Sequence, residues 1–157
     1  MNGPLKFPRS IPFAEALGFE LLRFDDGEAE VAVTLRKELT NSWDVAHGGL
    51  TMTLLDVTMA HAARTHTTAG EALPSSSVVT LEMKTSFMRP GTGRLQARAR
   101  RLHATASLAF CEGSVYDATG ALVAHATATF KYMRGLPAGR RKVHRPHGPG
   151  AETDPPP

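Results

Sequence analysis

The chain has 157 residues, of which 41% are hydrophobic and 21% charged, and this composition predicts one globular domain with a core of its own. The formal charge of +3 lies mostly near the C-terminus, where four of the 18 basic and two of the 15 acidic residues follow residue 135. The remainder, with 14 basic and 13 acidic residues, is close to neutral. We therefore expect no nucleic acid as a partner of the domain.

The two ends of the chain differ from its middle in composition. Residues 1–17 contain Pro4, Pro8 and Pro12 and no apolar run of signal-peptide length, and the whole chain contains no run long enough to span a membrane. We expect a cytoplasmic protein that does not bind membranes. Residues 136–157 are basic and rich in proline, which is typical of a disordered tail. The expected organisation is an N-terminal extension at 1–9, a domain at 10–135 and a tail at 136–157.

Turn residues and hydrophobic periodicity divide the domain into elements. A short helix is expected at 10–17, with Ser10 as its N-cap and Gly18 after its end. Two strands at 19–24 and 29–35 form a hairpin, and a loop then leads to a helix at 48–66. Four strands follow at 76–88, 94–102, 107–116 and 122–133. This order predicts an α+β fold in which an antiparallel sheet of five or six strands curls around one long central helix.

Alternation along the 76–88 strand predicts two faces. Val79, Leu81, Met83, Thr85 and Phe87 fall on one face, and Thr80, Glu82, Lys84 and Ser86 fall on the other.

The central helix is apolar on nearly every side, which is typical of a buried helix. Its ionisable side chains between Gly49 and Arg64 are Asp56 and His61. Because a buried carboxylate is costly unless it is hydrogen-bonded, Asp56 is a candidate functional group, and a structural carboxylate satisfied by hydroxyls or a cation is the alternative. His61 is interpreted as an ordinary helix side chain.

The loop before this helix ends in His47-Gly48-Gly49. Glycines at a helix start allow a ligand to approach backbone N–H groups that have no partner within the helix, so this turn predicts an oxyanion or phosphate site. Eight residues at 1.5 Å each separate Gly48 from Asp56 by roughly 12 Å along the axis. If both groups act on one reacting centre, they must come from two subunits of a dimer.

As a set, these motifs resemble those of the hotdog fold, and within it the PaaI-like acyl-CoA thioesterases. The matching residues are Asn41 six positions before His47, His47-Gly48-Gly49, Asp56, Thr80 ten positions before Pro90, Phe87-Met88-Arg89-Pro90, and the strand 124–130. The resemblance covers residues 10–134 and implies hydrolysis of an acyl or aryl-acyl CoA to a free acid and CoA.

The resemblance also implies roles for single residues. Gly48 would donate its N–H to the thioester carbonyl, and Asp56 of the facing subunit would be the nucleophile or the general base. Thr80 would orient the water, Asn41 would contact the substrate or leaving thiol, and His47 would hold the loop. Asp44 departs from the family, since many relatives have glycine there. The predicted substrate-binding residues are Gly49, Phe87, Arg89, Pro90 and Gly91, with Arg89 the best-placed cation for a CoA phosphate.

No metal or cofactor is expected, because the histidines lack neighbouring Cys or acidic residues in a ligand pattern. The single Cys111 follows three apolar residues and is expected to be a buried, unreactive thiol. The expected partners are the acyl-CoA substrate and a second copy of the chain, with dimer against tetramer left open.

Two other functions fit parts of the pattern. One is a hotdog dehydratase or hydratase acting on acyl-CoA or acyl-carrier protein, in which His47 would be the base, although the chain has no His-Phe-Pro loop. The other is a non-catalytic acyl-CoA-binding protein that keeps the pocket without turnover. Turnover of an acyl-CoA would separate an enzyme from a sensor.

Overall fold

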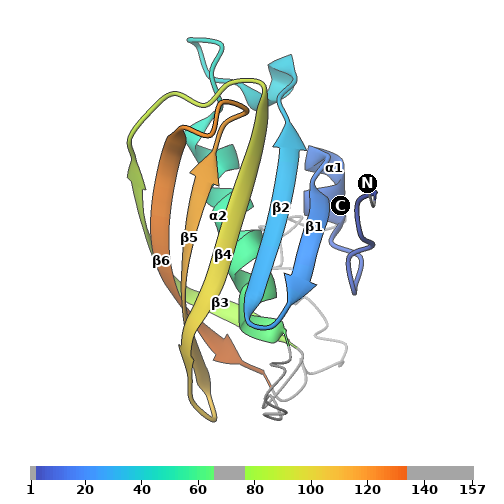
Figure 1. The fold of residues 1–157 in the computed structure, drawn as a ribbon, viewed down its shortest axis with the longest axis vertical. Helices are drawn as coiled ribbons and strands as arrows, with labels where there is room; N and C mark the ends of the chain where they lie inside the picture. The colour runs from blue at the N-terminus through green and yellow to red at the C-terminus, as the bar shows by residue number, and fades with distance from the viewer. Residues whose placement is uncertain (1–2, 66–76, 134–157) are drawn as a thin grey trace, which may run out of the picture.

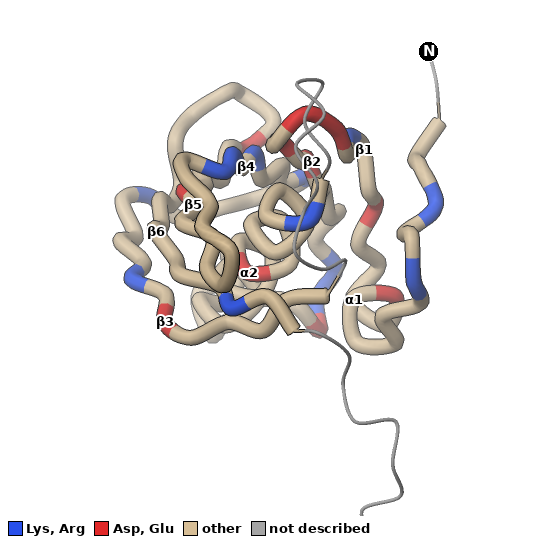
Figure 2. Tube along the Cα trace, turned by 90° about the horizontal axis from the view of Figure 1, so that it is seen from below, with Lys and Arg blue, Asp and Glu red and all other residues tan. Residues whose placement is uncertain are grey.

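A computed structural model describes residues 3–65 and 77–133. Its elements are α1 (Pro12–Leu17), β1 (Glu20–Asp25), β2 (Glu28–Thr34), η1 (Lys37–Leu39), α2 (Gly48–Arg64), β3 (Val78–Phe87), β4 (Arg94–Ala104), β5 (Leu108–Tyr116) and β6 (Leu122–Tyr132). The six strands form one antiparallel sheet in the order β1-β2-β4-β5-β6-β3. Figure 1 shows the sheet curving around α2, and the view from below shows α2 within the arc of strands (Figure 2). The expected α+β architecture is confirmed.

Turn and cap residues explain most element boundaries. Gly18 ends α1 with a left-handed φ of 76°, and Asp26 and Gly27, with φ of 44° and 78°, form the β1–β2 hairpin turn. The expected N-cap of α1 is wrong. Ile11 occupies that position, and the Ser10 hydroxyl instead donates to the Glu15 carboxylate at 2.8 Å.

The structure describes the N-terminal extension from residue 3 onward. Leu5 forms a bridge with Leu21 of β1, so the N-terminal extension lies against one edge of the sheet. The predicted disordered tail at 136–157 lies outside the described residues. Within the described part, no helix combines the length and hydrophobicity needed to cross a membrane.

The inner face of the sheet is built from small side chains, which lets α2 pack closely. A Cβ added to Gly113 of β5 would lie 3.1 Å from Met59 Cγ and 3.3 Å from Leu55 Cδ2. Leu54, Leu55 and Met59 are fully buried against this face. Close packing of large helix residues on small sheet residues therefore fixes the position of α2.

The α2 helix is not buried on every side, contrary to the sequence expectation. Met52 is 38% exposed, and Thr53, Asp56 and Val57 are half-buried. These residues follow one another at helical spacing and form a stripe that the sheet of the same chain does not cover. The apolar composition alone could not distinguish a helix covered by its own sheet from one that keeps a stripe for another surface.

The β3 strand contains a bulge that places Thr80 on the face opposite to the one predicted. Its register with β6 shifts between Thr80, which pairs with Phe130, and Glu82, which pairs with Thr129. Thr80 therefore shares the face of the fully buried Phe130, which is the face toward α2. Strict alternation placed Thr80 opposite Met83 and Phe87, and that assignment is wrong because the inserted residue resets the period.

Candidate active site

The loop before α2 is held by its own backbone and by Asn41. The Asn41 side-chain oxygen accepts hydrogen bonds from the N–H groups of Trp43 at 2.9 Å and Val45 at 3.4 Å. The Asn41 N–H donates to the Val45 carbonyl at 2.9 Å. Asp44 has a φ of 55°, in the left-handed region that glycine favours and that aspartate tolerates, so the aspartate is compatible with this turn.

The start of α2 presents a backbone N–H without an acceptor. His47 is the N-cap, and its Nδ1 accepts from the Gly49 N–H at 2.9 Å. Within residues 3–65 and 77–133, the Gly48 N–H has no hydrogen-bond acceptor. A Cβ at Gly48 would be 3.6 Å from Phe87 Cζ, so the Phe87 ring packs beside this amide. The arrangement is a helix start at which the first amide is free and an aromatic side chain flanks it.

Asp56 and Thr80 meet on the uncovered stripe of α2. The Thr80 hydroxyl donates to Asp56 Oδ1 at 2.7 Å. The β3 bulge makes this contact possible, because it turns Thr80 toward the helix. The hydroxyl fixes one carboxylate oxygen, and Asp56 Oδ2 has no partner within the described residues.

The remaining predicted substrate-binding residues surround the β3–β4 connection. The Arg89 guanidinium is exposed and donates to the Leu122 carbonyl at 3.1 Å. Pro90 is exposed as well. Gly91 is buried, and its carbonyl accepts from the Ala46 N–H at 2.8 Å. Gly91 thereby ties the loop before α2 to the β3–β4 connection.

A groove lies beside the start of α2. It has a volume of about 180 Å³ and is bounded by Phe13 and Leu17 of α1, Leu39 of η1, and His47, Gly49 and Leu50. The sequence reading did not single out the α1 and η1 residues. The one available signal was the apolar face of the short first helix, and a helix that short carries little periodicity.

Two titratable side chains in the core are held in their neutral forms. Burial lowers the pKa of His61 to about 4, and its ring lies edge-on to Phe7 and Phe24 at centroid distances of 5.3 and 5.6 Å. Burial raises the pKa of Cys111 to about 12, and the thiol is 1% exposed. The expected burial of Cys111 is confirmed, and a buried thiol with a raised pKa is a poor nucleophile.

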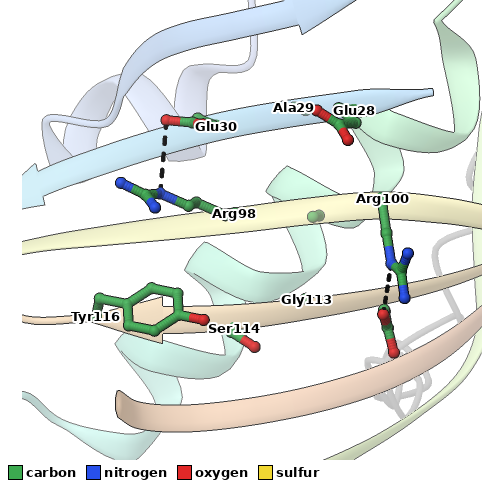
Figure 3. Close-up of a pocket in the computed structure, with 10 residues that line it drawn as sticks. Glu28, Ala29, Glu30, Arg98, Arg100, Gly113, Ser114 and Tyr116 are labelled. Atoms are coloured by element: carbon green, nitrogen blue, oxygen red, sulfur yellow. Dashed lines mark hydrogen bonds and ion pairs between the residues drawn. The ribbon is translucent and has the colours of Figure 1, made fainter. Parts of the chain in front are cut away.

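The outer face of the sheet carries a separate cavity of about 220 Å³. Figure 3 shows that it lies between ion pairs on neighbouring strands, Arg98 with Glu30 at 3.8 Å and Arg100 with Glu112 at 2.6 Å. None of the predicted site residues lines it. In the described part of the chain, no three His, Cys, Asp or Glu residues are grouped to hold a metal ion.

Comparisons with known proteins give relatives that cover most of the chain. Residues 44–124 match the family model described as the Thioesterase superfamily. The medium/long-chain acyl-CoA thioesterase YigI of Salmonella typhimurium is 27% identical over 135 residues, which cover 79% of this chain and 87% of YigI.

Two solved structures extend the similarity to three dimensions. A conserved protein of Pseudomonas aeruginosa superposes with a TM-score of 0.69 and 31% identity, covering 79% of this chain and 95% of the other. A mutant of the phenylacetic acid degradation protein PaaI of Thermus thermophilus superposes with a TM-score of 0.66 and 33% identity, covering 78% and 100%. The curved sheet around one long helix is therefore the hotdog fold that the motifs implied.

Proposed function

The chain belongs to the thioesterase superfamily and is a thioester hydrolase, and we propose that it hydrolyses an acyl-CoA to a free acid and CoA. The observation that carries this proposal is the hydrogen bond of 2.7 Å between Thr80 and Asp56. This hydrogen bond lies on the uncovered stripe of α2, and the first amide of the same helix is free. The relative YigI is an acyl-CoA thioesterase, which supports the choice of CoA as the leaving group.

Gly48 supplies the electrophilic half of the proposed site. As the thioester is attacked, negative charge develops on its carbonyl oxygen, and the Gly48 N–H would donate to that oxygen. The helix start adds favourable partial positive charge at the same place. A donor of this kind is typically worth about 3 kcal/mol of the activation barrier.

Asp56 supplies the basic half. As a general base, its carboxylate takes a proton from water, the hydroxide attacks the carbonyl carbon, the C–S bond breaks, and the CoA thiolate takes up the proton. As a nucleophile, it attacks the carbonyl carbon itself, and the C–S bond breaks to release the CoA thiolate. Water then hydrolyses the resulting anhydride to the free acid and the Asp56 carboxylate, and the proton that water gives up goes to the thiolate. In both routes the Thr80 hydroxyl orients the group beside Asp56. Asn41, whose side-chain oxygen holds the loop, would use its amide N–H groups toward the substrate.

We propose that the two halves come from different subunits. Gly48 and Asp56 lie roughly 12 Å apart along one α2 axis, too far for one carbonyl to meet both. The β3 strand ends the sheet and has no neighbour on its outer side among the described strands. On β3, Val79 is 37% exposed and Leu81 is 54% exposed, and Met52 of α2 is 38% exposed. A second copy that covers β3 and the stripe of α2 would bury these side chains and bring Asp56 to the partner's Gly48.

The reaction needs water and no further cofactor, so we propose a cofactor-independent enzyme. A cytoplasmic location, the absence of nucleic acid and membrane partners, and the pairing of dimers into tetramers stay predictions. So does the placement of the catalytic domain at residues 10–135. The Arg89 guanidinium, exposed at the β3–β4 connection, is proposed to meet a CoA phosphate.

A thiol-release assay across short, medium, long and aryl acyl-CoAs tests the reaction. The Asp56→Asn variant keeps the shape of the side chain and removes its charge, so kcat should fall at least a hundredfold while the protein stays folded and oligomeric. If Asp56 were a structural carboxylate instead, the variant would melt at a lower temperature and turn over at the wild-type rate.

Mixing two inactive variants tests the shared site. Asp56→Asn lacks the base, and Gly48→Pro lacks the amide donor. A heterodimer can carry both lesions in one site, which leaves the second site intact. Co-expression should therefore restore up to about half of the wild-type activity per heterodimer. Heterodimers verified by mass that recover nothing, formed from a Gly48→Pro chain that folds and dimerises, would contradict the shared site.

A further inference from the structure

The groove beside the start of α2 lies close to the proposed oxyanion site. His47 and Gly49 line the groove, and Gly48 lies between them in the chain. A thioester carbonyl held at the Gly48 N–H would therefore have the groove next to its carbonyl carbon. One of the two substituents of that carbon, the acyl chain or the sulfur arm, can then lie along this side.

The walls of the groove are apolar. Phe13 is 63% exposed, which is a large fraction for an aromatic side chain, and Leu17 of the same helix is half-buried. Leu39 and Leu50 are 6% exposed each and form the floor. The Thr53 hydroxyl donates to the Gly49 carbonyl at 2.8 Å, so it is not available as a donor to a ligand.

The groove has one acidic side chain in its lining, and that side chain is paired with a cation. Glu38 is the one acidic residue that lines it, and this exposed carboxylate lies 3.6 Å from the Arg36 guanidinium. Phosphates and the polar pantetheine arm of CoA match neither the apolar walls nor an acidic group. A hydrocarbon chain without a terminal charge matches both.

We propose that this groove is the acyl-binding site and that it selects neutral, apolar acyl groups over carboxylated ones, a proposal that rests on the acyl-CoA hydrolysis proposed above. The volume of about 180 Å³ is about six times the ~30 Å³ of a liquid water molecule. It accommodates the first carbons of a chain, and longer chains continue beyond Phe13. Phe13 and Leu17 are the specificity-determining residues.

The acyl-chain dependence of kcat/KM tests the proposal. Each methylene that enters an apolar groove contributes about 0.8 kcal/mol, which corresponds to about a fourfold rise in kcat/KM. We expect the wild type to show this rise from butyryl-CoA upward and then a plateau. A wild-type profile that is flat across the series would overturn the acyl assignment, while the presence of hydrolysis would leave the proposed reaction intact.

Two variants change the wall from opposite directions. Phe13→Ala removes an exposed ring and should lower the ratio of kcat/KM for octanoyl-CoA over butyryl-CoA about tenfold. Leu17→Trp adds volume and should move the plateau to shorter chains. The matched control is Phe110→Ala, which removes an aromatic side chain that is 37% exposed on the outer face of β5 and should leave the ratio unchanged.

The charge at the rim gives an independent readout. Glu38→Gln should raise severalfold the ratio of kcat/KM for an ω-carboxyacyl-CoA to kcat/KM for the neutral acyl-CoA of equal length. Wild-type chain-length ratios in both wall variants would overturn the proposal. A second copy of the chain would then be the occupant, and Phe13→Ala would weaken dimerisation instead. Failure of the wild type to hydrolyse any acyl-CoA would overturn the proposed reaction itself.

Discussion

The two ends of α2 are treated in opposite ways by the rest of the chain. At the C-terminal end, the Ala63 carbonyl accepts from Arg101 Nη1 at 3.1 Å and from the Tyr132 hydroxyl at 2.9 Å, and Arg101 also donates to the Thr65 carbonyl at 3.0 Å. At the N-terminal end, His47 satisfies the Gly49 N–H and the Gly48 N–H is left free. A helix leaves backbone groups unpaired at both of its ends. The protein satisfies these groups at the C-terminal end of α2 and leaves the Gly48 N–H free at the N-terminal end, where we propose that the substrate binds.

The two ends of α2 also differ in whether their residues belong to the core or to the proposed site. Residues near the C-terminal end, such as His61 at 1% exposure, belong to the core. His47 and Gly49 at the other end are exposed. Changes at the C-terminal end should therefore act on the free energy of unfolding, and changes at the N-terminal end on kcat.

The largest effect is expected at Gly48. Gly48→Pro removes the free N–H and should lower kcat by about 10² to 10³, the scale of losing one oxyanion donor. The fold should tolerate proline there, because Gly48 is the first helical residue and His47 has the extended φ of −62° and ψ of 137° that precede proline well.

Gly48→Ala is the matched control for this prediction. It keeps the N–H and adds a Cβ at 3.6 Å from Phe87 Cζ, an ordinary contact, so its kcat should stay near that of the wild type. Steady-state kinetics and thermal melting of both variants check the pair. Equal losses of kcat in the alanine and proline variants would mean that space at Gly48, and not its N–H, is needed.

The second effect concerns pH and the buried histidine. The folded pKa of His61, about 4, lies below the ordinary value of 6.5, so the unfolded chain binds the additional proton between these values. Stability from the neutral ring is therefore complete above about pH 6.5 and is lost as the pH falls toward 4, by up to about 3 kcal/mol.

Urea denaturation at about pH 7.5 and about pH 5 checks this, with a loss of about 2 kcal/mol expected between them from this residue. His61→Leu, which has no titrating group, should show a smaller loss over the same interval. An identical pH dependence in the variant and the wild type would assign the acid sensitivity to other groups.

The third effect tests the satisfied end of α2. Arg101→Met removes the donors to the Ala63 and Thr65 carbonyls and should lower the free energy of unfolding by about 2 kcal/mol, with kcat nearly unchanged. Arg100→Met is the adjacent control. It breaks an exposed pair with Glu112 and should cost less than about 1 kcal/mol. A large loss of kcat in Arg101→Met would break the division between the two ends.

The smallest effect is expected at Thr80. Its hydroxyl positions Asp56 and water without taking a proton, so Thr80→Ala should lower kcat about tenfold, much less than Asp56→Asn. Ser86→Ala removes an exposed hydroxyl from the opposite face of β3 and should have no effect. A folded Thr80→Ala enzyme as inactive as the Asp56 variant would require a direct catalytic role for the hydroxyl.

Local sequence signals were sufficient for the elements and for the motif at the helix start. Alternating apolar residues marked the strands, and Gly18 and the Asp26-Gly27 pair have the positive φ values that glycine and aspartate predict. The α2 helix begins at Gly48, as its two glycines and the following apolar run indicated. Such signals are readable because backbone preferences and hydrophobic periodicity act over a few neighbouring residues.

Tertiary structure alone decided how the distant parts of the site meet. The register of β3 against β6 depends on residues about 50 positions apart, so the bulge that turns Thr80 to Asp56 leaves no mark in the local alternation. The uncovered stripe of α2 and the groove between Phe13, Leu39 and Leu50 depend on which surfaces the curved sheet reaches. Periodicity reports that a side chain is apolar, and packing between segments far apart in the chain determines what, if anything, covers it.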